Sequence, residues 1–185
     1  MKRLSLLTFL LTITMASTYK EPSYTVIQKN DNIELRQYSE YVIARTSIKN
    51  GNLDENNNMF RNLGGYIFGN NKENISIPMT APVITTNNDT SYDMIFFMLN
   101  AKTPEDLPEP TNSEVFLETM EMGKTISISF GMWATDSRVS YYKKILDQFI
   151  NENNLEINSE LMVAQYNSPW TLPPFRKNEL LYKIK

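Results

Sequence analysis

The sequence predicts an α+β fold in which two ββαββ units form a largely antiparallel, distorted barrel with two helices packed outside it. Two observations predict this class. Segments with strand and helix patterns follow one another in the order strand, strand, helix, strand, strand, and this order occurs twice along the chain. A Pro-rich, acidic segment at residues 100–113 joins the two halves and is expected to cross the surface. No residue-level repeat accompanies the order of elements, so the duplication is one of pattern alone.

Strand patterns dominate the first half of the chain. Five segments rich in β-branched and aromatic residues are predicted strands: residues 24–28, 33–38, 41–48, 75–86 and 92–99. The sequence KNDN between the first two favours a hairpin turn. The last segment is apolar on both faces, which indicates a strand buried between a helix and the barrel interior.

A helix is predicted after the third of these strands. Apolar residues recur at positions 59, 60, 63 and 67, which is a helical period, and Gly69 follows as a stop. Gly64 and Gly65 lie inside this helix and each costs it roughly 1 kcal/mol relative to alanine. That cost indicates that a strand or a flat ligand packs closely against the two glycines.

The second half repeats the order. Predicted strands at residues 115–122 and 125–133 are joined at Gly123, and strands at 160–166 and 179–184 end the unit. Between the pairs, apolar residues share one face of a predicted helix over about 137–153, with Asp136 as its cap. Three prolines make residues 168–174 a stiff surface loop, after which the last strand fastens the C-terminus into the sheet.

Composition excludes several classes of function. The chain has 185 residues, which favours one domain, and its formal net charge of −3 comes without a Lys/Arg run, so nucleic-acid binding is not expected. The sequence has no His and no Cys, which excludes Ser-His-Asp and Cys-His catalysis, the usual zinc sites, iron–sulfur clusters and disulfides. A bond from the protein to a haem iron would have to come from Met, Tyr or, more weakly, Lys.

The N-terminal residues have the pattern of a secretory signal. Lys2 and Arg3 precede the apolar run Leu4–Ile13, and small residues follow it. We therefore expect residues 1–17 to be a signal peptide, with a retained short membrane anchor as the alternative, and the protein to be exported to a periplasm or secreted. The run is too short for an ordinary membrane span, and none is expected after processing.

Three separate blocks of the chain resemble one family. The segments YTVIQKNDNIELRQYSEYVIARTSI, IPMTAPV and YNSPWTLPPFRKNELLYKI are similar to the SOUL family, the haem-binding-protein family, in the order in which that family has them. The match runs from about Tyr24 to Ile184, so the resemblance implies a single domain at residues 20–185. It implies a duplicated α+β barrel and non-covalent binding of a tetrapyrrole in a shallow apolar groove, often without a strongly coordinating His.

The resemblance also implies a set of site residues. The first helix would supply an apolar groove with Arg61 as its basic residue, and the closing segment would rim it with cations that pair with carboxylates. The implied residues are Met59, Phe60, Leu63, Gly64, Ile67, Trp170, Arg176 and Lys177. Two simpler interpretations stay open: the helical stripe packs against the sheet, and the two cations pair with Glu179 or another carboxylate.

The function expected from these arguments is non-enzymatic binding of haem or a related tetrapyrrole by a monomer, as a carrier or buffer. One alternative is a small-molecule hydrolase or a sensor-type domain that uses Glu and Tyr, which a buried Glu with a raised pKa beside a Tyr in an open cavity would favour. The other alternative is a protein-interaction module without a small ligand, favoured if the groove is filled by its own side chains.

Overall fold

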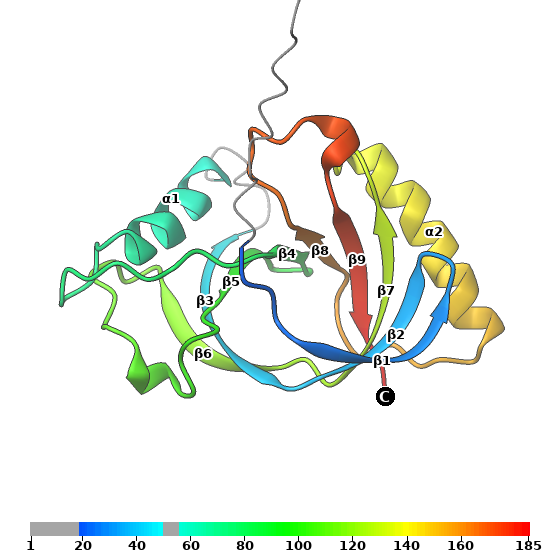
Figure 1. Cartoon of the computed structure of the whole chain (residues 1–185), viewed down its shortest axis with the longest axis horizontal. Coiled ribbons are helices and arrows are strands. Elements are labelled where there is room, and N and C mark those ends of the chain that lie inside the picture. Colours follow the sequence, from blue (N-terminus) through cyan, green and yellow to red (C-terminus); the bar gives the residue numbers. More distant parts are fainter. Residues whose placement is uncertain (1–18, 50–55) are drawn as a thin grey trace, which may run out of the picture.

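The computed structural model describes residues 19–49 and 56–185, so the expected signal segment lies outside the described residues. Nine described strands form one antiparallel sheet in the order β1-β2-β7-β9-β8-β4-β5-β3-β6, and the sheet curls into a half-barrel with α1 and α2 on its outside (Figure 1). The elements are β1 Tyr24–Asn30, β2 Ile33–Tyr38, β3 Glu40–Lys49, α1 Asn56–Ile67, β4 Val83–Asn87, β5 Ser91–Phe97, η2 Pro104–Asp106, β6 Phe116–Glu121, β7 Lys124–Phe130, α2 Asp136–Glu152, β8 Met162–Gln165, η3 Pro173–Phe175 and β9 Asn178–Lys183. The predicted α+β class is confirmed.

The two ββαββ units interlock. The first consists of β2, β3, α1, β4 and β5, and the second of β6, β7, α2, β8 and β9, while β1 is an additional strand at one edge. Strand β2 of the first unit pairs with β7 of the second, and β6 of the second pairs with β3 of the first. The units also meet where β4 pairs with β8 in the middle of the sheet. Neither unit therefore forms a complete sheet by itself.

Two details differ from the sequence-based expectations. The predicted strand at 75–86 is paired in the main sheet only as β4, and the residues before it form a loop that contains Pro78 and Pro82. Proline has no N–H for a sheet ladder, which explains the shortening. Thr135, and not Asp136, is the N-cap of α2, because its hydroxyl oxygen accepts a hydrogen bond from the Arg138 backbone N–H at 3.4 Å.

Three apolar clusters hold the sheet and helices together. One fills the inside of the curl and includes Phe97 and Leu181. A second lies between α2 and the sheet around Leu146 and Ile150, and a third lies between α1 and the sheet around Leu63 and Phe96. Phe96 and Phe97 are neighbours that enter different clusters, so the prediction of a strand buried on both faces is confirmed for β5. No helix in the described ranges is long and apolar enough to cross a bilayer.

Candidate functional site

The inner face of α1 belongs to the core. Met59, Leu63 and Ile67 are fully buried, and Leu63 and Ile67 pack in the cluster beneath α1. The structure therefore places these three predicted groove residues against the sheet, as the simpler interpretation of the apolar stripe expects. Their side chains stabilise the position of α1.

A second apolar row lies on a flank of α1 where Phe60 and Phe68 are exposed and Gly64 between them is buried. Phe60, Gly64 and Phe68 follow one another at intervals of four residues, so they lie along one side of the helix and its last turn. Phe60 is 44% exposed and Phe68 is 69% exposed. A Cβ placed on Gly64 would lie 3.8 Å from the Phe60 ring and 3.9 Å from the Phe68 ring. The row is a strip of two aromatic rings with a glycine between them, and we call it the α1 strip.

The glycines of α1 do not contact a strand at the positions of their missing side chains. The atoms nearest to the Gly64 position are those of the two phenylalanine rings, and those nearest to the Gly65 position belong to the Asn70 side chain, at 3.1 Å. The nearest packing at the two glycines is therefore made by side chains of α1 and of the turn after it, and the alternative expectation of a flat ligand stays a prediction. Sequence reasoning found Phe60 and Gly64 but missed Phe68, although the four-residue interval that connects the three was visible in the sequence.

The α1 strip is turned toward the centre of the sheet. On one flank of α1, Tyr66 donates a hydrogen bond to the Pro108 carbonyl at 2.9 Å and Asn62 donates one to Glu114 at 2.7 Å, in the segment that leads into β6. On the other flank, the Phe60 ring meets the Phe96 ring of β5 edge-on, with centroids 5.6 Å apart. Strand β5 pairs with β4, and β4 and β8 lie between the two helices in Figure 1, so this second flank faces the middle of the sheet.

A cavity of about 590 Å³ lies on the α2 side of the same region. Its walls include Thr85 and Val163 from the central strands, Val139 and Lys143 from α2, and Tyr182 from β9. Lys143 is already paired with Asp147 at 2.5 Å and lies 5.9 Å from the centre of the Tyr182 ring. The volume falls in the range of small-molecule sites, roughly 300–1,000 Å³.

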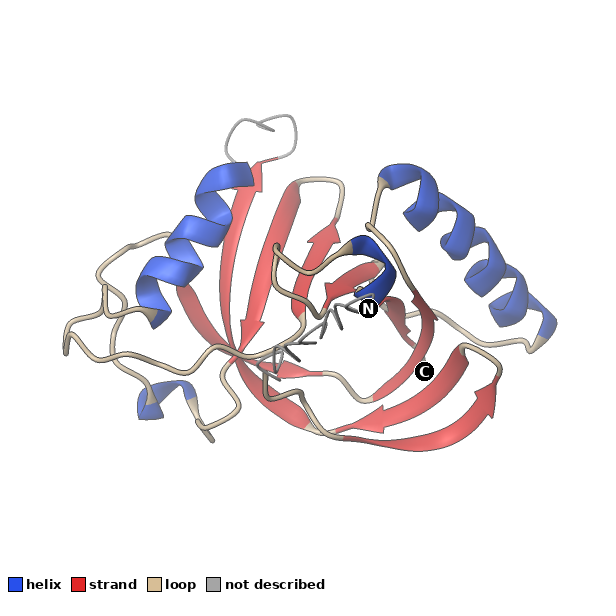
Figure 2. Cartoon of the chain, turned by 45° about the horizontal axis from the view of Figure 1, so that its top comes forward, coloured by secondary structure: helices blue, strands red, loops and turns tan. Residues whose placement is uncertain are grey.

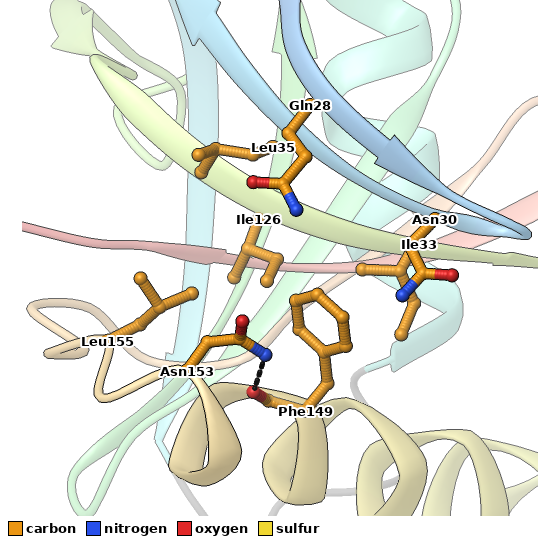
Figure 3. Close-up of a pocket in the computed structure, with 8 residues that line it drawn as sticks. All are labelled: Gln28, Asn30, Ile33, Leu35, Ile126, Phe149, Asn153 and Leu155. Atoms are coloured by element: carbon orange, nitrogen blue, oxygen red, sulfur yellow. Dashed lines mark hydrogen bonds between the residues drawn. The ribbon is translucent and has the colours of Figure 1, made fainter.

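A smaller cavity lies at the other end of α2 (Figure 3). Its volume is about 170 Å³, and Ile33, Phe149 and Leu155 contribute apolar walls. Asn153 donates a hydrogen bond to the Phe149 carbonyl beside it, at 2.8 Å. This volume is below that of ordinary ligand pockets, so a tetrapyrrole does not fit there.

The loop between β8 and β9 holds the remaining predicted residues. The Arg176 guanidinium stacks 3.5 Å above the Trp133 ring and donates hydrogen bonds to the carbonyls of Thr171, Pro169 and Ser168, at 2.9, 2.7 and 3.2 Å. Arg176 thus holds the loop together through these hydrogen bonds, and its side chain is buried. In contrast, Trp170 projects from the loop and is 90% exposed.

Lys177 differs from Arg176 in its accessibility. Its ammonium group lies 3.7 Å from the centre of the Tyr166 ring and 3.2 Å from a carboxylate oxygen of Glu21, and its side chain is 42% exposed. Both views place the loop between α1 and α2 (Figures 1 and 2). The α1 strip and the loop therefore border the same side of the molecule, while Met59, Leu63 and Ile67 lie beneath α1.

The inside of the curl holds a buried polar cluster that sequence reasoning missed. Glu179 accepts two hydrogen bonds from the Arg36 guanidinium at 2.8 Å, one from the Tyr166 hydroxyl at 2.6 Å and one from the Ser129 hydroxyl at 2.9 Å. Burial by itself raises the pKa of Glu179, but the hydrogen bonds and charge of Arg36 hold it below its ordinary value. Burial and the charge of Glu179 raise the pKa of Tyr166.

This cluster answers one of the questions left by the sequence. A buried Glu does lie beside Tyr residues, but its pKa is lowered, whereas a general acid at this position would need a raised one. All four hydrogen bonds that Glu179 accepts come from the protein's own side chains. The geometry is that of a buried ion pair that fixes the sheet.

Comparison with known proteins gives one family and several fold neighbours. The model of the SOUL heme-binding protein family matches residues 19–183. A search of curated proteins finds no match. Among solved structures, a hydrolase from Listeria innocua is similar at 12% identity, covering 86% of this chain and 94% of its own, with a TM-score of 0.60.

Two further structures are similar in fold. An uncharacterized conserved protein from Listeria innocua has 12% identity over 91% of this chain and 94% of its own, with a TM-score of 0.62. The EcmrR C-terminal domain has 7% identity over 88% of this chain and 98% of its own, also with a TM-score of 0.62. At these identities the likeness concerns the fold alone.

Proposed function

The chain belongs to the SOUL heme-binding protein family, and on that premise we propose that it binds haem or a related tetrapyrrole non-covalently, as a carrier or buffer and not as an enzyme. The α1 strip is the observation that supports this proposal, and it is the surface on which we propose that the ligand binds. Phe60 and Phe68 offer exposed rings on either side of Gly64, which is itself buried, and a planar apolar ligand stacks well on exposed aromatic rings.

The described side chains fit a tetrapyrrole ring better than they fit its iron. The sequence has neither His nor Cys. Met59 is fully buried beneath α1, and the hydroxyl of Tyr66 donates its hydrogen bond to the Pro108 carbonyl. Apolar contact and stacking would therefore supply the affinity, and the iron would be held only as part of the ligand, without a bond from the protein.

Cations near the α1 strip and the loop would orient the acidic edge of the ligand. Arg61 is exposed and directly follows Phe60, and Lys177 keeps part of its side chain in solvent beside Trp170's loop. Arg176 is engaged with three carbonyls, so its role in the proposal is to shape the loop that carries Trp170. An Arg or Lys beside a carboxylate forms a charge-assisted hydrogen bond, which suits the propionates of haem.

The hydrolase among the fold neighbours raises the competing function of acid–base catalysis. The lowered pKa and complete pairing of Glu179 favour the binding function over acid–base catalysis.

For the cellular setting we propose export, on the strength of Lys2, Arg3 and the apolar run Leu4–Ile13. Fractionation of the native host followed by N-terminal sequencing tests this: a cytosolic chain with an intact N-terminus would refute it.

Titration of the purified protein with hemin tests the binding function. We expect a saturable change of the Soret band at micromolar hemin. Phe68→Ser removes an exposed ring, whereas Phe60→Ser also removes the edge-on contact with the buried Phe96 ring, and each should weaken binding by about tenfold. Ile27→Ser removes an exposed apolar side chain on β1 and should leave the affinity unchanged.

Two results would refute the proposal or its location. A Soret band that grows in proportion to added hemin without saturation shows non-specific adsorption. Equal losses in the Ile27→Ser control and in the two phenylalanine variants show that the α1 strip is not the site. Melting temperatures of all three variants, measured in parallel, separate loss of binding from loss of fold.

A further inference from the structure

Five large apolar side chains are exposed on two adjoining loops. Trp170, Leu172 and Phe175 lie on the loop between β8 and β9 and are 90%, 65% and 74% exposed. Met132 and Trp133 lie on the loop between β7 and α2 and are each more than a third exposed. We call these five side chains the apolar patch. Monomeric proteins rarely leave such patches on the surface without a partner.

The two loops form one continuous surface. The Arg176 guanidinium lies 3.5 Å above the Trp133 ring, and the Asn178 side chain donates a hydrogen bond to the Met132 carbonyl at 2.8 Å. In Figure 1 the β8–β9 loop rises at the upper rim of the molecule between α1 and α2.

The backbone holds the apolar side chains outward. Pro169, Pro173 and Pro174 restrict the loop, and the hydrogen bonds of Arg176 to its carbonyls brace it from within. A flexible loop would fold its Trp, Leu and Phe back onto the protein. A rigid loop that keeps these apolar side chains in water is suited to insertion into a fluid apolar phase.

The sequence that precedes the described residues favours a lipid bilayer as that phase. Glu21, close to the start of the described chain, pairs with Lys177 at the base of the loop, at 3.2 Å. The apolar run Leu4–Ile13 ends six positions before Tyr19, a stretch that spans at most about 22 Å. In the alternative in which residues 1–17 are retained as a short membrane anchor, the patch lies within reach of the same bilayer surface.

We propose that the apolar patch docks onto a lipid bilayer, with Trp170, Leu172 and Phe175 entering the interfacial layer. Trp is favoured at this depth because its ring is apolar while its N–H finds a polar partner. The charge of Lys177 is offset by Glu21, so the attraction rests on apolar insertion and does not need anionic lipid.

The chain carries its own probes for this test, because both of its tryptophans belong to the patch. The full-length protein with Trp133→Phe emits from Trp170 alone. It is mixed with vesicles of phosphatidylcholine whose acyl chains carry bromine, or of the same lipid without bromine. We expect a shift of the Trp170 emission to shorter wavelength and quenching by the brominated lipid.

Matched variants locate the contact. In the Trp133→Phe background, Leu172→Ser with Phe175→Ser should lower the partition coefficient reported by Trp170 by about tenfold. Ile27→Ser, which removes an exposed apolar side chain on β1, should leave the partition coefficient unchanged. Because no tetrapyrrole is present, failure of this test is independent of failure in the hemin titration.

Three outcomes would overturn the proposal. Protein that sediments with vesicles while the Trp170 emission stays unshifted and unquenched is held by its N-terminal run alone. An emission shift that appears without lipid and grows with protein concentration identifies a second copy of the chain as the occupant. Binding that requires phosphatidylserine and disappears in high salt is electrostatic attraction and not insertion.

Discussion

Arg36 and Glu179 form two parallel hydrogen bonds of 2.8 Å each, although 143 positions separate them in the sequence. Both side chains are buried, with 2% and 1% of their surface exposed. They come from β2 and β9, which lie on either side of β7, and Ser129 of β7 adds a further hydrogen bond to the same carboxylate. The pair therefore joins three strands from the two interlocked units at one point.

Removing one member of this pair should be much more costly than removing both. Glu179→Leu removes the buried partner of Arg36 and leaves it only the less buried Glu34 carboxylate at 2.7 Å, so we expect the free energy of unfolding to fall by about 3 kcal/mol. The double variant Arg36→Met with Glu179→Leu removes both charges and should be more stable than either single variant. Urea unfolding measures the three values. In contrast, Glu109→Gln in the exposed pair with Lys72 should change the free energy by less than about 1 kcal/mol. A double variant as unstable as the sum of the single ones would contradict this account.

Acid should destabilise the protein through the same carboxylate. The pKa of Glu179 is lower in the folded protein than the value of about 4.3 expected of an unfolded chain, because Arg36 outweighs the effect of burial. The stabilisation is thus complete above about pH 4.3 and is lost as the pH falls through the lower, folded pKa. Thermal unfolding between pH 7 and pH 3 should show this loss, and Glu179→Gln should flatten the pH dependence in that window. An unchanged slope in Glu179→Gln would assign acid sensitivity to other groups.

The two glycines of α1 should respond differently to alanine. At Gly64 a Cβ would make ordinary contacts of 3.8 and 3.9 Å, so Gly64→Ala should raise the free energy of unfolding by about 0.5–1 kcal/mol through helix propensity. At Gly65 a Cβ would lie 3.1 Å from the Asn70 side chain, which must move, and Gly65→Ala should gain less. Chemical denaturation compares the two variants directly. A larger gain at Gly65 would be inconsistent with this packing.

Iron should contribute little to the affinity for a tetrapyrrole. The sequence lacks His and Cys, and Met59 and Tyr66, the Met and Tyr of α1, are both buried. We therefore expect iron-free protoporphyrin to bind with a dissociation constant within about tenfold of that of hemin, which corresponds to about 1.4 kcal/mol. Fluorescence titration with protoporphyrin, compared with absorbance titration with hemin, supplies both constants. Hemin that binds very much more tightly would indicate a bond from the protein to the iron.

Arg176 should act on the loop and not on the ligand's charge. Its guanidinium links three backbone carbonyls of the loop, so Arg176→Ala should speed proteolytic cleavage within residues 168–175. Arg176→Lys should not restore protection, because an ammonium group lacks the planar fork that reaches several acceptors together. Lys177→Ala serves as the matched control and should leave the cleavage rate unchanged. If Arg176→Ala is cleaved as slowly as the unsubstituted protein, the prolines alone account for the rigidity of the loop.

Local patterns predicted most of the elements but not their partners. A short local pattern is enough to predict the hairpin of β1 and β2, the helix α2 and the strand β9. The exchange of β2 and β6 between the units is a relation between segments far apart in the chain, and no local period encodes it. Pro78 and Pro82 were visible in the sequence, and their effect on strand length was underestimated.

The same distinction applies to the candidate site. The apolar period of α1 identified the helix, but it did not tell which residues of the helix face the sheet and which face solvent. Phe68 follows from the interval of four that already connected Phe60 and Gly64. Arg36 could not be assigned to Glu179, because only the folded sheet brings β2 and β9 to either side of one strand.

The place of β9 in the sheet has a consequence for how the protein is made. This strand is the last of the described strands along the chain, yet it lies between β7 and β8 and completes the cluster beneath α2. Until residues 178–183 are free, β7 and β8 have no shared neighbour and the second unit cannot close. Folding of the second unit therefore waits until residues 178–183 have been synthesised, so the strands made before them stay unpaired for longer.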